Sequence, residues 1–380
     1  MANYSEQDRR RKKQQDSTGM IALKIVGKIL VFVLVTLLVF IGTLYLTLTK
    51  IKNSSEAARN LLITTLMESG QLKFVAHMVC SDEEIEEIVS VNSMQTMDVD
   101  QDTSLIEMDT TSTATDAVAD VEDEEEYDEN GIRIEEISGR SFFAKMMIIK
   151  DPSTVSVGST YPWGKYGKEL GELVEDSGAV AGVNGGLYVS TANSGGSPMG
   201  VVVQGGEITY NNPYGLSGLY VIGLNNDNIL IVDEITGMSG ADFETYVKDK
   251  GIRDAVAFQD EASDSNNHFV PLIINGEPRQ LGGQGSGANP RTAIGQRKDG
   301  SILLLVTDGR GTSGHLGATA SDLIAIMQEY GAVNAANLDG GSSSSMYYKG
   351  VYEMSSVTFY YKNSSWRLPD AFVVKPKGGN

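Results

Sequence analysis

The sequence predicts an α+β fold with mixed β-sheets and about three helices, preceded by a single N-terminal transmembrane helix. From Ile132 onward, short runs rich in Val, Ile, Phe and Tyr alternate with glycine, as half-buried strands and tight turns require. Few helical patterns interrupt these runs, and they follow no regular alternation, which disfavours a doubly wound parallel fold. Upstream, Ile29–Leu48 contains 20 residues without a charge.

That uncharged stretch predicts a membrane anchor. At about 1.5 Å per residue it spans about 30 Å, the thickness of a hydrocarbon core. A basic flank precedes it, with Arg9–Lys13, Lys24 and Lys28, which predicts a cytoplasmic N-terminus for the tail 1–28. No small-residue cleavage site follows it. We therefore expect residues 29–49 to be an uncleaved, single-pass signal anchor in the lipid bilayer of the cell membrane, with the C-terminal domain extracellular.

Residues 50–90 predict a membrane-proximal helical stalk. Ser55 is a candidate N-cap, and Ser81 with Glu84 forms a capping-box pattern before an apolar helix face. His77 and Cys80 are too few to form a metal site, and a single cysteine excludes an internal disulfide framework.

Residues 91–131 predict an extended, disordered acidic spacer. The stretch from Ser81 to Asn130 holds 19 acidic residues and no Lys or Arg. Mutual repulsion and low hydrophobicity disfavour a packed structure there. The formal charge of the whole chain is −20, so the rest is close to neutral. No basic stripe is left to bind nucleic acid.

Residues 132–380 predict the folded domain. A hairpin is expected at Asp299-Gly300, which would place Arg291 and Asp308 at the same end of two neighbouring strands. Three helices are expected, at Lys165–Asp176, Ala241–Lys250 and Ala320–Tyr330, the last capped by Thr319. The expected strands are Ser141–Lys150, Ala179–Val183, Gly200–Gln204, Gly218–Gly223, Ile229–Val232, Ala255–Phe258, Thr292–Gln296, Ile302–Thr307, Ala335–Leu338 and Ala371–Val374.

In four segments, an apolar strand ends in a polar residue that is followed by a loop of small residues. They are Val183–Gly186, Asn289–Gly295, Thr307–Gly311 and Asn337–Ser345. Carboxylates such as those of Asp308 and Asp339 can act as acid, base or nucleophile on a sugar. A guanidinium such as that of Arg291 can grip a phosphate through two parallel hydrogen bonds. Taken singly, each motif is also explained by an ordinary turn or a structural ion pair.

Other catalytic patterns are absent from the sequence. There is no G-x-S-x-G elbow, Walker loop or dinucleotide fingerprint, and the glycines at Gly282–Gly287 fit neither nucleotide-binding spacing. Of the three histidines, His315 follows Asp308 and is the one placed near a candidate site, with plain solvent exposure equally compatible.

The order of these motifs resembles the phosphodiester glycosidase domain family, which includes N-acetylglucosamine-1-phosphodiester alpha-N-acetylglucosaminidase and bacterial exopolysaccharide-associated relatives. The resemblance covers about Phe142–Val374. It also includes Ser197-Pro-Met-Gly200 and Arg367-Leu-Pro-Asp-Ala-Phe-Val-Val374. Two segments depart from the family pattern, Ala257–His268 and Gly311–Thr319, and we expect them to reshape the pocket.

The resemblance implies hydrolysis of sugar-1-phosphodiesters at the glycosidic bond. It places Arg291 on the phosphate, Asp339 and Asp308 on the sugar side as the catalytic carboxylates, and Asn184 in substrate orientation. It leaves open a Ca²⁺ or Mg²⁺ ion between carboxylates, since histidine and cysteine ligands for zinc are lacking. The expected substrate-binding residues are Asn184, Gly185, Gly186, Thr292, Arg310, Gly340, Gly341, Ser342 and Ser343.

Three functions follow as hypotheses. The first is a membrane-anchored hydrolase acting on phosphodiester-linked sugars in cell-wall glycans or exopolysaccharide of the cell envelope. The second is a non-catalytic polysaccharide-binding module on the same fold. The third is a phosphodiesterase that cuts the P–O bond on the far side of the phosphate. The sequence does not distinguish the sugar, the aglycone, a retaining from an inverting outcome, or the oligomeric state.

Overall fold

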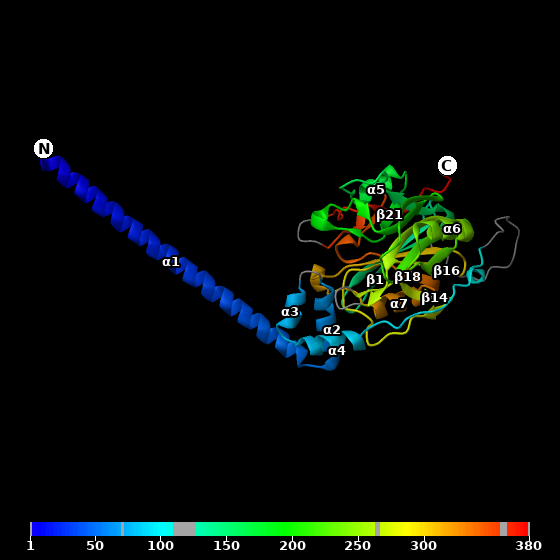
Figure 1. Cartoon of the computed structure of the whole chain (residues 1–380), viewed down its shortest axis with the longest axis horizontal. Coiled ribbons are helices and arrows are strands. Elements are labelled where there is room, and N and C mark those ends of the chain that lie inside the picture. The colour runs from blue at the N-terminus through cyan, green and yellow to red at the C-terminus, as the bar shows by residue number, and fades with distance from the viewer. Residues whose placement is uncertain (1, 70–71, 109–126, 263–266, 358–362, 379–380) are drawn as a thin grey trace.

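A computed structural model describes residues 2–69, 72–108, 127–262, 267–357 and 363–378 (Figure 1). Its folded part contains three main β-sheets, and every pair of described strands is antiparallel. The expectation of mixed sheets is therefore wrong in this respect. All ten expected strands are present, with boundaries shifted by a few residues.

The first sheet has seven strands, in the order β1 (Ile132–Ser138), β2 (Phe143–Ile149), β17 (Ile302–Thr307), β16 (Thr292–Arg297), β18 (Ala332–Asn337), β14 (Pro271–Ile274) and β15 (Glu277–Pro278). The second has five, β10 (Leu230–Glu234), β9 (Leu219–Asn225), β11 (Ile252–Gln259), β7 (Gly200–Gln204) and β8 (Glu207–Asn212). The third has five, β20 (Val351–Met354), β19 (Met346–Tyr348), β4 (Ala181–Asn184), β21 (Asp370–Val374) and β3 (Val155–Ser159). Two short ribbons pair β12 (Glu261–Ala262) with β13 (Asn267–His268), and β5 (Tyr188–Val189) with β6 (Ser197–Pro198).

The three sheets surround one common core. In β17, Leu304 faces this core while Leu303 faces the opposite side of its sheet. In β21, Phe372 likewise faces the common core, and Val373 faces the opposite side of its sheet. This alternation is the period-two pattern of a strand buried on both faces. Residues from all three sheets thus meet in a single hydrophobic cluster.

One helix covers the outer face of each sheet. Helix α7 (Ala320–Glu329) packs on the first sheet, α6 (Gly240–Lys250) on the second and α5 (Leu170–Asp176) on the third. Thr319 caps α7 in a full capping box, as expected. The first of the expected helices is shorter than Lys165–Asp176, because its first five residues lie outside regular helix.

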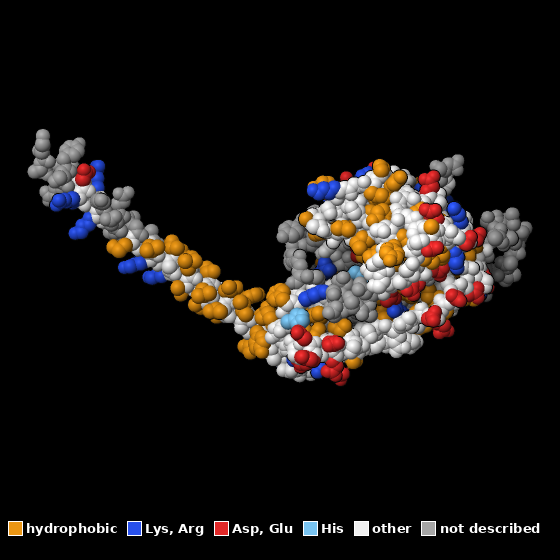
Figure 2. Space-filling view, in the orientation of Figure 1, with side chains coloured by type: hydrophobic (Ala, Val, Ile, Leu, Met, Phe, Trp, Pro, Cys, Tyr) orange, Lys and Arg blue, Asp and Glu red, His pale blue; other side chains and the backbone are white. Residues whose placement is uncertain are grey.

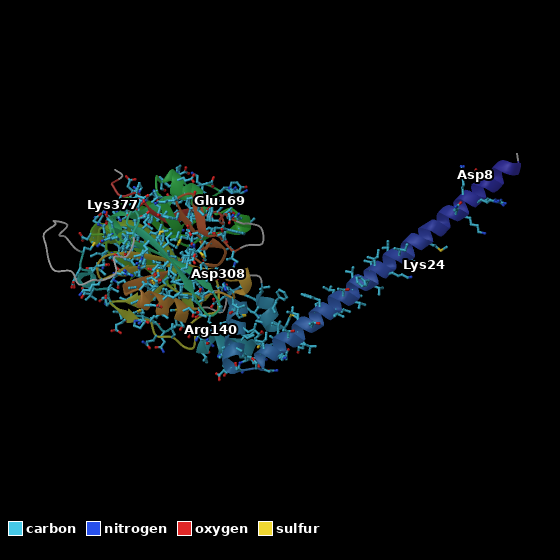
Figure 3. All side chains as sticks on the ribbon, turned by 180° about the vertical axis from the view of Figure 1, so that it is seen from behind. Asp8, Lys24, Arg140, Glu169, Asp308 and Lys377 are labelled. Atoms are coloured by element: carbon cyan, nitrogen blue, oxygen red, sulfur yellow. The ribbon has the colours of Figure 1, made fainter. Side chains whose placement is uncertain are left out.

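The N-terminal part adds four more helices. Seven α-helices are present among the described residues, so the expected total of about three holds for the domain alone. Helix α1 (Ala2–Lys52) projects from the molecule, and its stretch Leu23–Lys52 is long and apolar enough to cross a membrane. Figure 2 shows hydrophobic side chains along it, with basic ones nearer the N-terminus. Figure 3 shows open space around the side chains of α1, for example at Lys24, whereas Leu48 near the end of the helix is buried.

Helices α2 (Glu56–Glu68), α3 (Lys73–His77) and α4 (Asp82–Val91) pack together around Ile63, Ala76 and Ile85. We call them the helical unit. Ser55 caps α2, and Ser81 with Glu84 forms the expected capping box of α4. Short 3-10 turns occur at Thr103–Leu105, Pro152–Thr154, Thr191–Asn193, Thr312–Gly314 and Gly341–Ser343.

Residues 92–107, which we call the strap, run along the domain in Figure 1 instead of standing away from it. The Gln95 amide donates to the Gln280 carbonyl at 3.0 Å. The Gln101 side-chain amide donates to the Leu230 carbonyl of β10 at 2.5 Å and accepts from the Val232 amide at 2.9 Å. The Glu107 amide donates to the Lys298 carbonyl at 2.7 Å. This part of the expected acidic spacer is therefore ordered on the domain, while 109–126 lie outside the described residues.

Candidate active site

The candidate site lies where strands of two sheets end. The hairpin of β16 and β17 forms as expected, with Thr292 opposite Val306, so Arg291 and Asp308 share one end. Strand β18 joins β16 with Asn337 opposite Ala293, which brings Asp339 to the same edge. Strand β4 of the third sheet ends beside them at Asn184.

An open pocket of about 530 Å³ occupies this edge. Five of the expected site residues line it: Arg291, Arg310, Asp339, Gly340 and Gly341. The other lining residues are Glu68, Phe258, His268, Asn289, Asn337 and Leu338.

Asp339 is the expected catalytic carboxylate that reaches the pocket. Burial raises the pKa of its carboxyl to about 6, although hydrogen bonds from Ser343 and the Gly340 amide and the charge of Arg310 oppose this shift. The Gly340 amide donates to Oδ1 at 2.9 Å. A carboxylate with a pKa near neutral, on the wall of a pocket, is typical of an acid–base or nucleophilic group.

Asp370 is a second carboxyl beside Asp339. It is only 1% exposed, its Oδ1 accepts from the Gly186 amide at 2.8 Å, and its Oδ2 has no hydrogen-bond partner among the described residues. Burial raises its pKa to about 7, and the charge of Asp339 adds to the shift. A Cβ on Gly185 would lie 2.2 Å from Asp370 Oδ1, so a larger residue there would displace the Asp370 carboxyl.

A hydrogen-bonded brace behind the pocket holds Asp339. Asn184 donates to the Asp339 carbonyl at 2.6 Å and accepts from Thr292 Oγ1 at 2.7 Å and from the Ser345 amide at 3.2 Å. Ser343 Oγ lies 2.9 Å from the Tyr188 hydroxyl. Asn184, Gly185, Gly186, Thr292, Ser342 and Ser343, which we expected on the substrate, do not line the pocket.

Two arginines face the pocket from different elements. Arg291 precedes β16, and its guanidinium lies 4.9 Å from the centre of the Phe269 ring. Arg310 follows β17 with a φ of 52° and donates to Ser342 Oγ at 2.8 Å. Burial and the nearby charge of Arg291 lower the pKa of Arg310. Two cations and a carboxylate on one wall fit a substrate that carries a phosphate and a sugar.

Asp308, the other expected catalytic carboxylate, does not line the pocket. Its Oδ1 accepts from the Phe143 amide at 2.7 Å, and its Oδ2 lies 2.7 Å from His315 Nδ1. It is buried, and Figure 3 marks its position in the domain. These bonds join β2, β17 and the loop that carries Arg310, so Asp308 and His315 fix the loop instead of touching the pocket.

Sequence reasoning missed Glu68, Asp370, His268 and Phe258 as residues at or beside the pocket. Asp370 lies in the family-like ending, and Phe258 and His268 lie in the departing segment Ala257–His268. That segment does contribute to the pocket wall, as expected. Glu68 carried no signal, because its position on the pocket depends on contacts between segments more than 200 residues apart.

No group of three or more His, Cys, Asp or Glu side chains that could hold a metal ion occurs in the described part of the chain. The Ca²⁺ or Mg²⁺ ion that the sequence left open stays a prediction: Asp339 and Asp370 supply two carboxyls, and Mg²⁺ can bind through one or two carboxylates together with a substrate phosphate.

Comparisons with known proteins identify the family and support the fold. A family model described as phosphodiester glycosidase matches residues 177–375, just over half of the chain. The solved catalytic domain of zebrafish N-acetylglucosamine-1-phosphodiester alpha-N-acetylglucosaminidase, auto-inhibited by its pro-peptide, is similar with a TM-score of 0.51. It is 17% identical, and the match covers 65% of this chain and 82% of that one.

Two further matches are weaker. A putative exported protein from Burkholderia pseudomallei aligns with a TM-score of 0.43 and 15% identity, over 62% of this chain and 74% of that one. The SPbeta prophage-derived uncharacterized protein YomE of Bacillus subtilis is 42% identical over 64 residues. That match covers 17% of this chain and 10% of the relative, so the chain spans about a tenth of the relative's length.

Proposed function

The chain belongs to the phosphodiester glycosidase family, and on this premise we propose that it hydrolyses the glycosidic bond of sugar-1-phosphodiesters, with Asp339 as the catalytic carboxylate. The observation that supports this best is the wall shared by Asp339, Arg291 and Arg310. It sets a carboxylate beside two guanidinium groups in one pocket.

The division of roles follows from the chemistry of the bond. Cleavage of the glycosidic bond releases a phosphomonoester, a good leaving group that needs little protonation, so cations can replace much of the usual acid's work. Arg291 and Arg310 stabilise the charge that develops on the departing phosphate. Asp339 supports the oxocarbenium-like sugar centre or activates the attacking water.

Asp308 keeps a supporting role in this proposal. Its two hydrogen bonds fix the loop after β17, and that loop carries Arg310 into the pocket. Asn184 orients the substrate indirectly, because it holds the backbone of Asp339.

We place the reaction outside the cytoplasm, on glycans of the cell envelope. The apolar stretch of α1 supports a membrane anchor, and the basic residues before it support a cytoplasmic N-terminus. A domain held at the membrane surface can act on wall polymer or exopolysaccharide close to the bilayer.

The test uses the full chain in detergent micelles, with UDP-N-acetylglucosamine and extracted wall polymer as substrates. Wild type is compared with Asp339→Asn, Arg310→Ala and a control, Asp249→Asn, whose carboxylate is exposed on α6. We expect free N-acetylglucosamine and UDP from wild type and control. Asp339→Asn should lose activity by about 10³-fold or more, since the geometry of the pocket remains but the charge is lost.

The products separate the alternatives. Sugar-1-phosphate and UMP would mean that the P–O bond is cut, which makes the chain a phosphodiesterase. Saturable binding of polymer without turnover, unchanged in Asp339→Asn, would favour the polysaccharide-binding module.

A further inference from the structure

The pocket has one wall that does not come from the domain. Glu68, the last residue of α2, lines it beside Arg291. Glu68 Oε2 accepts from Arg291 Nη2 at 2.5 Å and from Asn289 Nδ2 at 3.0 Å, and its Oε1 accepts from the Gly287 amide at 2.5 Å. The two side chains of the ion pair are only 6% and 9% exposed.

The glycine-rich loop Gly282–Gly287, which fits no nucleotide-binding pattern, is the surface on which the helical unit docks. A Cβ on Gly287 would lie 2.6 Å from the backbone of Thr64 and Thr65, so the helix approaches the loop closer than any side chain allows. Thr65 Oγ1 accepts from the Ala288 amide at 3.0 Å. At the other end of the loop, a Cβ on Gly282 would lie 2.2 Å from the Val91 carbonyl at the end of α4.

The hydrogen bonds of Arg291 show what Glu68 does for it. Nη2 donates to Glu68, to Ser286 Oγ at 3.2 Å and to the Gly287 carbonyl at 2.9 Å. Nε donates to the Ala318 carbonyl at 3.4 Å. For Nη1 there is no partner among the described residues. The protein thus holds Nε and Nη2, and Arg291 lines the pocket, so Nη1 is the nitrogen that we expect to meet a ligand there.

We propose that Glu68 is a positioning residue of the active site: the membrane-proximal helix α2 supplies the carboxylate that holds Arg291 so that its Nη1 meets the substrate phosphate. The active site is then built jointly by the helical unit and the domain. This inference rests on the proposed function, since it names what orients the phosphate-binding arginine.

Charge supports this role. A buried guanidinium without a counter-ion is strongly unfavourable, and Arg291 lies near a second cation, Arg310. Glu68 neutralises the charge of Arg291 by binding Nη2, and it does not occupy Nη1. A carboxylate that merely imitated the substrate would be displaced by it, whereas Glu68 is fixed by three separate donors and by the close packing of α2 on Gly287.

The experiment compares full-length wild type with Glu68→Gln and Glu68→Ala, all in detergent micelles. The matched control is Glu56→Gln, because Glu56 is exposed on the same helix. Hydrolysis of UDP-N-acetylglucosamine gives kcat and KM, calorimetry gives the affinity for N-acetylglucosamine-1-phosphate, and thermal unfolding shows whether each variant is folded. Each assay of Glu68→Ala is repeated with added acetate or formate, which can replace the missing carboxylate.

We expect Glu68→Gln to lose about 10- to 100-fold in kcat/KM, because a guanidinium displaced by about 1 Å no longer meets the phosphate correctly. Glu68→Ala should lose at least as much, and formate should restore part of its activity. Glu56→Gln should match wild type.

Higher activity in Glu68→Ala, with inhibition by formate, would overturn the inference, because Glu68 would then compete with the substrate anion. Unchanged kcat/KM in both variants would overturn it as well. If wild type hydrolyses nothing, the proposed function fails while the affinity measurement still decides the role of Glu68: weaker sugar-phosphate binding in Glu68→Gln supports it, and equal or tighter binding contradicts it.

Discussion

The ionisation of Asp339 sets the pH range in which the proposed chemistry operates. Its carboxyl has a pKa raised to about 6 by burial, against an ordinary value near 4. In the proposed mechanism the ionised form supports the sugar cation or activates water. The reactive fraction of the protein should therefore change within the physiological pH range.

We predict that kcat/KM for UDP-N-acetylglucosamine rises about tenfold per pH unit below pH 6 and levels off above it. The rise follows the fraction of ionised Asp339 in the free protein. Initial rates of sugar release between pH 4 and 8 measure it. A rate that falls as the pH increases through 6 would make Asp339 the proton donor instead.

The buried carboxyl of Asp370 makes stability depend on pH. Its pKa is raised to about 7 in the folded protein, so between pH 4 and 7 the folded state binds more protons than the unfolded state. The free energy of unfolding must then decrease as the pH rises through this window. Asp339 adds a contribution of the same sign below pH 6.

We predict that Asp370→Asn flattens this dependence, since an amide in the same place has no proton to lose. Thermal unfolding of wild type and Asp370→Asn from pH 4 to 8 tests it, with Asp249→Asn as the exposed control. Wild type and Asp370→Asn losing the same number of degrees over this range would contradict the prediction.

Local sequence identifies residues at the site but not which way they face. Asp308 and Asp339 look alike, each placed after an apolar strand and before a glycine. Only Asp339 reaches the pocket, because the Phe143 amide and His315 take both oxygens of Asp308. Those partners come from other elements, so no pattern around Asp308 reveals them.

Strands and caps follow more closely from local pattern. All ten expected strands and the three domain helices are present, because alternation and capping act over a few neighbouring residues. The main omissions were β1, which alternates charged and apolar residues, β8, which is largely exposed, and β3, β14, β19 and β20, which are three to five residues long. Such strands form because a neighbouring strand pairs with them.

The docking of α2 on the glycine-rich loop gives a prediction about an element. Gly287→Ala should push α2 away, because the added methyl group would overlap the backbone of Thr64 and Thr65. We expect faster amide hydrogen exchange in α2, a cost of about 1–3 kcal/mol in stability, and about tenfold lower kcat/KM through the loss of the Glu68–Arg291 contact.

The control for this change is Gly164→Ala. A Cβ at Gly164 has nothing within 4 Å, so the same substitution there should leave exchange, stability and rate unchanged. Equal protection of α2 in wild type and Gly287→Ala would show that the helix does not depend on this close contact.

The N-terminal segments contact the domain more extensively than the sequence indicates. Local pattern predicts a stalk and a spacer that merely connect the anchor to the domain. Instead, the helical unit and the strap lie on the domain through Glu68, Gln95 and Gln101. Contacts of this kind join segments more than 100 residues apart, and composition alone does not reveal them. The acidic strap is held mainly by backbone and amide hydrogen bonds, which high charge does not prevent.

This arrangement predicts different outcomes for two truncated chains. A chain of residues 54–380 loses α1 but keeps the helical unit, the strap and Glu68. A chain of residues 132–380 also loses these, which leaves the buried Arg291 without its carboxylate and Arg279 without the Gln95 carbonyl that its Nε contacts at 2.7 Å. We expect the longer chain to keep wild-type kcat/KM without detergent, and the shorter one to unfold at a lower temperature and to lose about 10- to 100-fold in kcat/KM. Rates and thermal unfolding of both chains, measured against the full-length protein, decide the matter. Equal rates in the two truncated chains would mean that the domain forms a complete active site alone.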